Sequence, residues 1–292
     1  MVNEPLLVTG ASGYLGRRVI ARLETLGVPH IAVTRVSAGL HCDLTDREAV
    51  WKLLKRTAAK TVIHCAARVP AGMDDFESDA LAHENISMVK NLIAAVPEQV
   101  VFTSTMTVYR NPQRLPAREE DAANDLSGYP GGKRAAERLL LEAHKVRATI
   151  LRLPGLFGAP RRGGLLYNAA LAFAAGRQLS TPAAPPLWTV MHVDDAASMC
   201  VRAAQRTTPG SMLLNCAYPV RTSIESVLRE LASLLDAPAP AVPNAPMFEM
   251  DISRLIAELG PPDGSLHERL KELAAWAQRE VAAPTMNAGT HA

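Results

Sequence analysis

Tyr129 and Lys133 stand four residues apart at the start of a predicted helix, Tyr129–His144, so their side chains lie on one face of that helix. An ammonium group close to a phenol favours the phenolate and lowers the pKa of tyrosine from its usual value of about 10. A tyrosine tuned in this way can pass a proton to or from a carbonyl or an alcohol. The alternative is two surface residues on one helical turn. The neighbouring helices and strands therefore decide between a catalytic pair and two surface residues.

Those elements alternate between strand and helix patterns along the first half of the chain. Such an alternation predicts an α/β fold with a doubly wound parallel sheet, whose ligands bind at the carboxyl ends of the strands. Thr103, Ser104 and Thr105 end one of these strands and so lie at that edge. The predicted strands are Leu6–Thr9, His30–Thr34, Thr61–Cys65, Val100–Thr103 and Ala148–Leu153, and the helices before Tyr129 are Arg17–Leu26, Ala49–Arg56 (capped by Asp46) and Leu81–Val96.

A glycine-rich turn follows the first strand with the spacing G-x-x-G-x-x-G, formed by Gly10, Gly13 and Gly16. A strand, a glycine turn and the N-terminus of a helix together make a phosphate site, because backbone N–H groups and the helix dipole favour negative charge. Glycine is expected there because a Cβ would block a pyrophosphate. The alternative is an ordinary tight turn. The position directly after a β-rich run favours a dinucleotide site.

The composition of the chain changes after Gly155, where proline and glycine become frequent between helical patterns. We expect residues 1–155 to form a dinucleotide-binding Rossmann domain. Residues 156–282 are expected to form a smaller, mostly helical substrate lobe, with 187–206 returning to the Rossmann sheet and 283–292 forming a flexible tail. The helices predicted in this half are Leu165–Ala175, Ala196–Gln205, Ser223–Leu235 and Leu266–Val281.

Composition excludes several classes of function. The net charge of +2 gives no basic surplus, so we expect no nucleic-acid partner. The sequence shows no signal peptide, no apolar run long enough to span a bilayer and no metal-ligand cluster, which predicts a soluble cytoplasmic protein without a membrane partner. The four cysteines are far apart, and Cys65 and Cys216 are expected to be buried free thiols.

In order and spacing, the motifs resemble the short-chain dehydrogenase/reductase superfamily, in its extended branch that modifies sugar nucleotides. The resemblance covers nearly the whole chain, and the length and the short loop between the second and third strands are similar to dTDP-4-dehydrorhamnose reductases. The matching motifs are T-G-A-S-G-Y-L-G at Thr9–Gly16, C-D-L-T-D at Cys42–Asp46, H-C-A-A at His64–Ala67, S-T-M-T-V-Y at Ser104–Tyr109, Y-P-G-G-K at Tyr129–Lys133, L-R-L-P-G-L-F-G at Leu151–Gly158 and H-V-D-D at His192–Asp195.

The resemblance implies roles for particular residues. Tyr129 would be the catalytic acid/base, Lys133 would tune its pKa and bind the cofactor ribose, and Thr105 would hydrogen-bond the reacting oxygen. Asp43 would meet the adenine and Ala66 would line the cofactor channel. The full set expected at the cofactor is Gly10, Ser12, Gly13, Tyr14, Leu15, Gly16, Arg35, Asp43, Leu44, Ala66, Ala67, Tyr129, Lys133 and Leu156.

Four further residues are given supporting or structural roles. Asn85 lies in the helix that usually carries a supporting asparagine, and His192 is interpreted as structural. Asp194 and Asp195 are interpreted as an N-cap pair rather than a metal site, because no third ligand accompanies them.

The end of the second strand bears on the choice between NAD and NADP. NAD-selective sites usually carry an acidic residue there, which accepts hydrogen bonds from the ribose. Here the strand ends in Thr34-Arg35, and Ser37 follows. Arg35 could pair with a 2′-phosphate, a charge-assisted contact of about 1.5–3 kcal/mol, or be a solvated loop arginine. We predict NADP, with NAD as the alternative.

Departures from the family pattern narrow the reaction. Sugar-nucleotide dehydratases carry an Asp-Glu pair where this chain has Met106 and Thr107. GDP-fucose synthases use a cysteine and a histidine where Thr107 and Arg161 stand. What remains is redox chemistry at one carbon, either reduction of a ketone or 4-epimerisation through transient oxidation.

The substrate side also departs from many relatives, whose diphosphate ligands are an asparagine and an arginine where this chain has Gly155 and Trp188. Arg161 or Arg162 could supply the phosphate contact. Trp188 could stack on a base or sugar, or seal the two lobes as a core residue. The residues expected at the substrate are Arg68, Met106, Arg161 and Trp188.

The sequence therefore predicts an NADP-dependent reductase of a keto-sugar, nucleotide-linked, with Tyr129 as proton donor. One rival is a sugar 4-epimerase that retains NAD. The other is a non-catalytic NADP-binding regulatory subunit, although such proteins often lose the tyrosine or the lysine. We expect a homodimer through helices Leu81–Val96 and Tyr129–His144, as in relatives.

Overall fold

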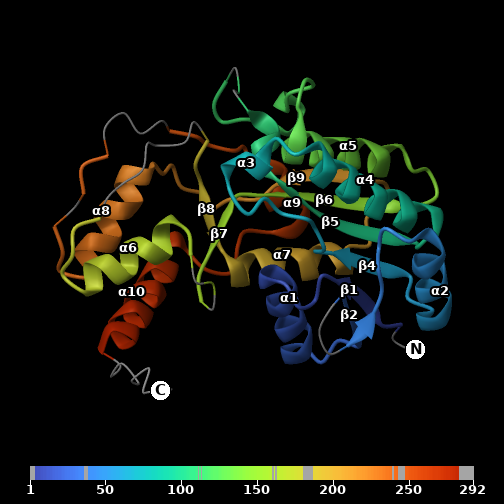
Figure 1. The fold of residues 1–292 in the computed structure, drawn as a ribbon, viewed down its shortest axis with the longest axis horizontal. Helices are drawn as coiled ribbons and strands as arrows, with labels where there is room; N and C mark the ends of the chain where they lie inside the picture. Colours follow the sequence, from blue (N-terminus) through green and yellow to red (C-terminus); the bar gives the residue numbers. More distant parts are fainter. Residues whose placement is uncertain are drawn as a thin grey trace, which may run out of the picture.

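The computed structural model describes residues 4–35, 39–110, 112, 114–159, 161, 163–179, 187–238, 240–242 and 247–282. At its centre lies a seven-stranded parallel sheet with the order β3-β2-β1-β4-β5-β6-β9 (Figure 1). Strand order reverses beside β1, which places a ligand crevice at the carboxyl ends of β1 and β4. The predicted α/β class is confirmed. The strands are β1 Leu6–Thr9, β2 His30–Thr34, β3 Leu40–His41, β4 Thr61–His64, β5 Gln99–Thr105, β6 Arg147–Leu153 and β9 Met212–Asn215.

Helices cover both faces of this sheet. On one face α1 (Tyr14–Thr25) packs against α7 (Val193–Gln205), and on the other α4 (Asp79–Ala94) packs against α5 (Gly128–Glu142) and α2 (Arg47–Thr57) (Figure 1). Consecutive strand residues therefore enter different cores: Val8 and Val101 belong to one, and Leu7 and Val100 to the other. Burial on both faces explains why the strands read as apolar runs without alternation.

Local capping agrees with the sequence at one helix and differs at another. Asp46 caps α2 as predicted, with its carboxylate accepting from the N–H groups of Glu48 and Ala49 at 2.8 and 3.1 Å. The interpretation of Asp194 and Asp195 as an N-cap pair is wrong. His192 caps α7, and its Nδ1 accepts from the Asp194 N–H, because the strand before α7 ends at His192 and the acidic pair already lies in the first turn of the helix.

The helical lobe is built from α6 (Leu165–Ala174), α8 (Ile224–Leu234) and α10 (Leu266–Ala282), which pack together beside the sheet (Figure 1). A two-stranded parallel ribbon, β7 (Gly155–Phe157) with β8 (Val190–His192), connects the lobe to α7. The remaining elements are α3 (Met73–Phe76), the 3₁₀ turns η1 (Met106–Tyr109) and η2 (Glu119–Asp121), and α9 (Ser253–Leu259).

The chain crosses between sheet and lobe more than once. After β8 it passes through α7 and β9, enters the lobe again at α8, returns to the sheet edge at α9 and ends in α10. Residues 187–206 thus contain β8 and α7, while the expected tail 283–292 lies outside the described residues. None of the described helices is long and apolar enough to cross a membrane.

Candidate active site

A cavity of about 230 Å³ opens at the carboxyl ends of β1 to β4. It gathers many of the residues expected at the cofactor and contains two cations, Arg35 and Arg68, and two carboxylates, Asp43 and Glu84. It is lined by Gly10, Ser12, Gly13, Val33, Thr34, Arg35, Cys42, Asp43, Leu44, Thr45, Cys65, Ala66, Ala67, Arg68, Glu84 and Met88.

The glycine turn fits a dinucleotide phosphate, although for a reason that differs in part from our expectation. A Cβ on Gly10 would lie 2.6 Å from the Ala66 nitrogen, and one on Gly16 would lie 2.1 Å from the Gly10 oxygen. These two glycines therefore allow the turn to pack on itself and on the segment after β4. Gly13 begins α1 without any side-chain cap, so the first N–H groups of the helix remain available to an anion.

Lys133 lies beneath this region in an almost completely buried position. Its Nζ donates a hydrogen bond of 2.9 Å to the carbonyl oxygen of Thr103 and lies 4.7 Å from the centre of the Phe102 ring and 5.8 Å from that of Tyr129. Burial lowers the pKa of Lys133 to about 8. Lys133 is therefore an ammonium near neutral pH that can lose its proton in a mildly alkaline range.

Tyr129 does not show the lowered pKa that the sequence predicts. Burial raises the pKa of its phenol to about 12, and the Phe76 ring packs beside it with centres 6.1 Å apart. The expected effect of Lys133 is missing because its ammonium is bonded to the backbone of β5 rather than to the phenol. In this arrangement the phenol is fully protonated at neutral pH.

The three hydroxyl groups at the end of β5 point to different partners. Thr103 donates to the carbonyl of His64 at 3.1 Å, and Ser104 donates to Glu137 at 2.6 Å, so both are bonded inside the protein. Thr105 is half-buried, and its Oγ1 accepts from the Thr107 N–H at 3.2 Å. The Thr105 Oγ1 also lies 3.1 Å from the Thr107 Oγ1, so all three hydroxyls have partners and Thr105 is the least buried residue of the trio.

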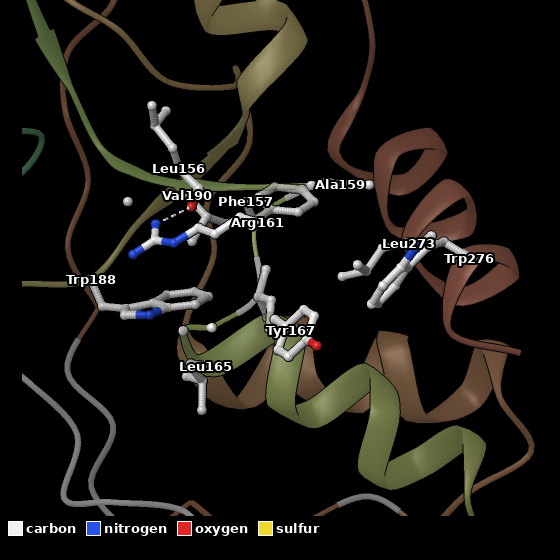
Figure 2. A pocket seen from close by; sticks show the side chains of 15 residues that line it. Leu156, Phe157, Ala159, Arg161, Leu165, Tyr167, Trp188, Val190, Leu273 and Trp276 are labelled. Carbon is white, nitrogen blue, oxygen red and sulfur yellow. Dashed lines mark hydrogen bonds between the residues drawn. The ribbon is translucent and has the colours of Figure 1, made fainter. Parts of the chain in front are cut away.

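A second cavity of about 200 Å³ lies where β7 and β8 meet the lobe (Figure 2). Aromatic rings dominate its wall: Figure 2 shows Trp188 on one side, and Tyr167 of α6 and Trp276 of α10 on the other, with ring centres of the latter pair 5.4 Å apart. Its lining residues are Gly155, Leu156, Phe157, Gly158, Ala159, Arg161, Gly163, Gly164, Leu165, Leu166, Tyr167, Trp188, Val190, Leu273 and Trp276.

Arg161 is the cation that this second cavity presents among the described residues. Its guanidinium donates to the Leu156 carbonyl at 2.9 Å and lies 5.6 Å from the centre of the Tyr14 ring. Tyr14 in turn donates to the Gly158 carbonyl at 2.6 Å. This chain of contacts joins the start of α1 to the wall of the second cavity. Arg162, the other candidate, lies outside the described residues.

Other predicted site residues are distributed differently from the expectation. Arg68, predicted at the substrate, lines the first cavity, where it pairs with Glu84 at 3.2 Å. The Asn85 amide fixes the Arg68 backbone by accepting from its N–H and donating to its carbonyl, both at 2.9 Å. Leu156, predicted at the cofactor, lines the second cavity, and Met106 packs against the core from η1.

The remaining predicted residues lie outside the lining of both cavities. They are Tyr14, Leu15, Gly16, Met106 and the catalytic group Thr105, Tyr129 and Lys133. Cys216 is buried as predicted, whereas Cys65 is half-buried because it faces the first cavity. Within the described part of the chain, no cluster of three potential metal ligands occurs.

Several side chains near the site were not predicted to matter. Glu137 and Arg152 form a buried ion pair behind Lys133, and Tyr167 closes the second cavity beside Trp276. A signal for Glu137 was present, because a residue four positions after Lys133 lies on the same helical face. No comparable signal marks Tyr167, which reaches the cavity only through the packing of α6 on α10.

Comparison with known proteins agrees with this geometry. Residues 6–217 match the family described as NAD dependent epimerase/dehydratase. The chain belongs to this family. Membership identifies an NAD(P)-dependent enzyme of the oxidoreductase type, with the Rossmann fold described above.

Relatives in the family carry different names. A UDP-glucose 4-epimerase of Azospirillum brasilense is 26% identical over 275 residues, covering 81% of this chain and 79% of its own. A dTDP-4-keto-6-deoxy-D-glucose reductase of Streptomyces niveus is 31% identical over 155 residues, covering 52% of each chain. Subunit β of methionine adenosyltransferase 2 from Bos taurus is 28% identical over 217 residues, covering 70% of this chain and 63% of its own.

Solved structures share the fold at lower identity. A UDP-glucose 4-epimerase of Thermotoga maritima, determined with UDP-glucose, superposes with a TM-score of 0.79 at 20% identity and covers 95% of this chain and 99% of its own. At this level of identity the likeness concerns the fold.

Proposed function

We propose that this protein uses NADPH to reduce a keto group of a nucleotide-linked sugar, with Tyr129 as the proton donor. The observation that carries the proposal is the placement of Tyr129 and Lys133 on α5 against the end of β5, where Thr105 lies, in a sheet whose first turn fits a dinucleotide phosphate. Reduction of a carbonyl needs a proton donor, an oxygen ligand and a reductant at one place, and this edge of the sheet would bring Tyr129 and Thr105 together with the bound cofactor.

The cofactor side of the proposal rests on the first cavity. Arg35 is exposed at its rim, and the exposed carboxylate of Asp43 accepts from the N–H and hydroxyl of Thr45 at 2.9 and 2.7 Å. An arginine just after β2, where NAD-selective sites usually carry an acid, suits the 2′-phosphate of NADP. When bound, NADPH supplies a hydride.

Side chains of this protein would donate the proton that the reduction requires. A phenol whose pKa lies near 12 is protonated at neutral pH and can donate to the oxygen of a carbonyl that gains negative charge. The ammonium of Lys133 lies close enough to stabilise the phenolate left behind, and Thr105 orients the oxygen. Lys133 would also hold the ribose of the cofactor.

The substrate side rests on the second cavity. The N-terminus of α6 follows Gly163 and Gly164, has no side-chain cap and lies beside Arg161, so N–H groups and one guanidinium converge where a diphosphate would bind. The ring of Trp188 offers a stacking surface for a base or sugar. Trp188 is also well buried, so sealing the two lobes remains its alternative role.

Two rivals follow from the relatives. The epimerase of Azospirillum brasilense matches four fifths of the chain, which favours 4-epimerisation with a retained cofactor as the second candidate. The likeness to subunit β of methionine adenosyltransferase 2 favours, as the third, a role as a partner subunit. The presence of both Tyr129 and Lys133 argues for catalysis.

An assay that follows NADPH absorbance against a panel of nucleotide-linked 4-keto-sugars tests the proposal. Consumption of NADPH in proportion to product supports the reductase. Interconversion of 4-epimers without added cofactor, by protein that copurifies with NAD, supports the epimerase. Inactivity throughout, together with NADP-dependent binding to another protein, supports the subunit.

We also propose a homodimer formed through α4 and α5. The outward side of these helices carries apolar groups that are only half-buried in the single chain, Ile86 and Leu139, and Leu141 is 40% exposed. A two-fold contact would cover them. Light scattering at micromolar concentration should report twice the chain mass, and a monomer would reject the dimer.

A further inference from the structure

A network of buried charges joins α5 to β5 and β6 directly behind Lys133. Glu137, four residues after Lys133, is completely buried and uses both carboxylate oxygens. One oxygen accepts from the Ser104 hydroxyl at 2.6 Å and from Arg152 Nε at 2.9 Å. The other accepts from Arg152 Nη2 at 2.7 Å and from Arg134 Nη1 at 3.0 Å.

Arg152 is also fully buried, and its remaining nitrogen is bonded. Nη1 donates to the Tyr109 hydroxyl at 2.9 Å and to the Glu119 carbonyl at 2.7 Å. Taking two charges out of water is costly, and well-packed apolar residues can often replace such a pair without loss of stability. Stability alone is therefore a weak reason for this pair to lie in the core.

The position of the network gives a better reason. Ser104, which Glu137 holds, is the residue between Thr103, whose carbonyl accepts from Lys133, and Thr105. Consecutive residues of β5 are thus bonded to consecutive turns of α5. A shift of α5 along β5 would break the Glu137 and Lys133 contacts together.

We propose that Glu137, clamped by Arg152, is a positioning residue for the Tyr129–Lys133 pair, fixing α5 on β5 and holding the Lys133 side chain in its charged form. That this positioning serves catalysis rests on the proposed function. The effect of Glu137 on the charge of Lys133 does not.

Few groups besides Glu137 act on the charge of Lys133. His64 and Cys65 face it from the end of β4, Tyr129 lies one turn earlier on α5, and the Phe102 ring faces it from β5. Burial and the nearby ammonium lower the pKa of His64 to about 3, so His64 is neutral there. Burial lowers the pKa of Lys133, and Cys65 and then the carboxylate of Glu137 oppose that fall. Loss of the carboxylate should therefore lower the pKa of Lys133 further.

The test measures Lys133 directly in the intact protein without cofactor. Lysine side chains labelled with ¹³C at Cε are titrated by NMR, and Lys133→Arg identifies the signal. The wild type should titrate near pH 8, and Glu137→Gln should move the midpoint down by roughly one pH unit. Asp195→Asn is the matched control. Asp195, on α7, is an equally buried carboxylate and pairs with Arg269 at 2.7 Å. The control should leave the Lys133 midpoint unchanged.

Further variants distinguish a failure to fold, a change of charge near Lys133 and a shift of α5 along β5. If Glu137→Gln does not fold, Glu137→Gln/Arg152→Met removes both charges and should show a smaller shift in the same direction, because loss of the Arg152 cation partly offsets loss of the carboxylate. Ser104→Ala keeps the charge, so it should leave the midpoint in place while kcat falls about tenfold or more through misplacement. An unchanged Lys133 midpoint in the Glu137 variants would overturn the inference. A wild type that reduces no keto-sugar would overturn the proposed function and leave the NMR result standing.

Discussion

The two cavities of this protein are built in opposite ways. The first is lined by residues at or just after the carboxyl ends of β1 to β4, together with two from α4, and all of them belong to the first 88 residues. Its wall carries charges of both signs. The second is assembled from three distant segments, residues 155–167, 188–190 and 273–276, and its wall is aromatic with Arg161 as its described cation. A cofactor shared by a whole family can be bound by local turns, whereas a substrate particular to one enzyme is bound by packing between segments.

We predict that the proposed catalytic group, which lines neither cavity, can be silenced without weakening binding in either. Tyr129→Phe keeps the ring and its packing against Phe76 but removes the transferable proton. Turnover should fall by about 10²–10⁴-fold, since general acid catalysis is worth that much. Affinity for NADPH, measured by calorimetry, should barely change. Lys133→Met should damage both turnover and affinity, and full activity in a folded Tyr129→Phe protein would refute the assignment.

Ligand binding in the second cavity should depend strongly on the charge of Arg161, although the wall of the cavity is mostly aromatic. Arg161→Ala removes the described guanidinium beside the N-terminus of α6, a contact of about 1.5–3 kcal/mol, and should weaken binding of a nucleoside diphosphate sugar by roughly 10–100-fold. Binding of NADPH should stay close to that of the wild type. Arg177→Ala, an exposed arginine just after α6, is the control. An equal loss in both variants would mean that the effect is general electrostatics.

The first cavity should discriminate cofactors through a single residue. We expect NADPH to bind about tenfold tighter than NADH, which is roughly 1.4 kcal/mol. Arg35→Ala should abolish the preference, whereas Arg47→Ala, an exposed arginine at the start of α2, should keep it. Calorimetric titration with each cofactor measures this. Equal affinities for NADPH and NADH in the wild type would contradict the proposal that Arg35 binds the 2′-phosphate.

Cysteine reactivity offers a finer probe of the same cavity. Cys42 and Cys65 line it and are half-buried, whereas Cys216 is buried outside its lining and serves as an internal control. NADPH should slow alkylation of the first two by N-ethylmaleimide several-fold. Burial and the adjacent Asp43 raise the pKa of Cys42 to about 11, so Cys42 should react slowly even without cofactor. Peptide mass spectrometry assigns the modified residues, and alkylation unaffected by NADPH would place the cofactor elsewhere.

Sequence reasoning succeeded where function depends on neighbours in the chain. The sheet, the glycine turn, the Asp46 cap and the spacing of Tyr129 and Lys133 are all local patterns, and the structure places each where the pattern predicts. It was less successful where a contact crosses between elements. Arg68 lies in the first cavity rather than the second because the Asn85 amide fixes its backbone there.

Electrostatics was the least predictable part. The spacing of Tyr129 and Lys133 suggests a lowered phenol pKa, yet the Lys133 ammonium is bonded to Thr103 and the phenol is desolvated. Burial and the direction of a hydrogen bond decide the sign of such a shift, and neither can be read from spacing alone.

The most direct test of the central claim follows the hydride itself. NADPH carrying deuterium at the transferable position of the nicotinamide is incubated with a nucleotide-linked 4-keto-sugar and the wild-type protein. The account predicts one deuterium on the new carbinol carbon for each NADPH consumed, and loss of this product by about 10²–10⁴-fold in rate with Tyr129→Phe. A product without deuterium, or 4-epimers interconverted while NADPH is untouched, would contradict it.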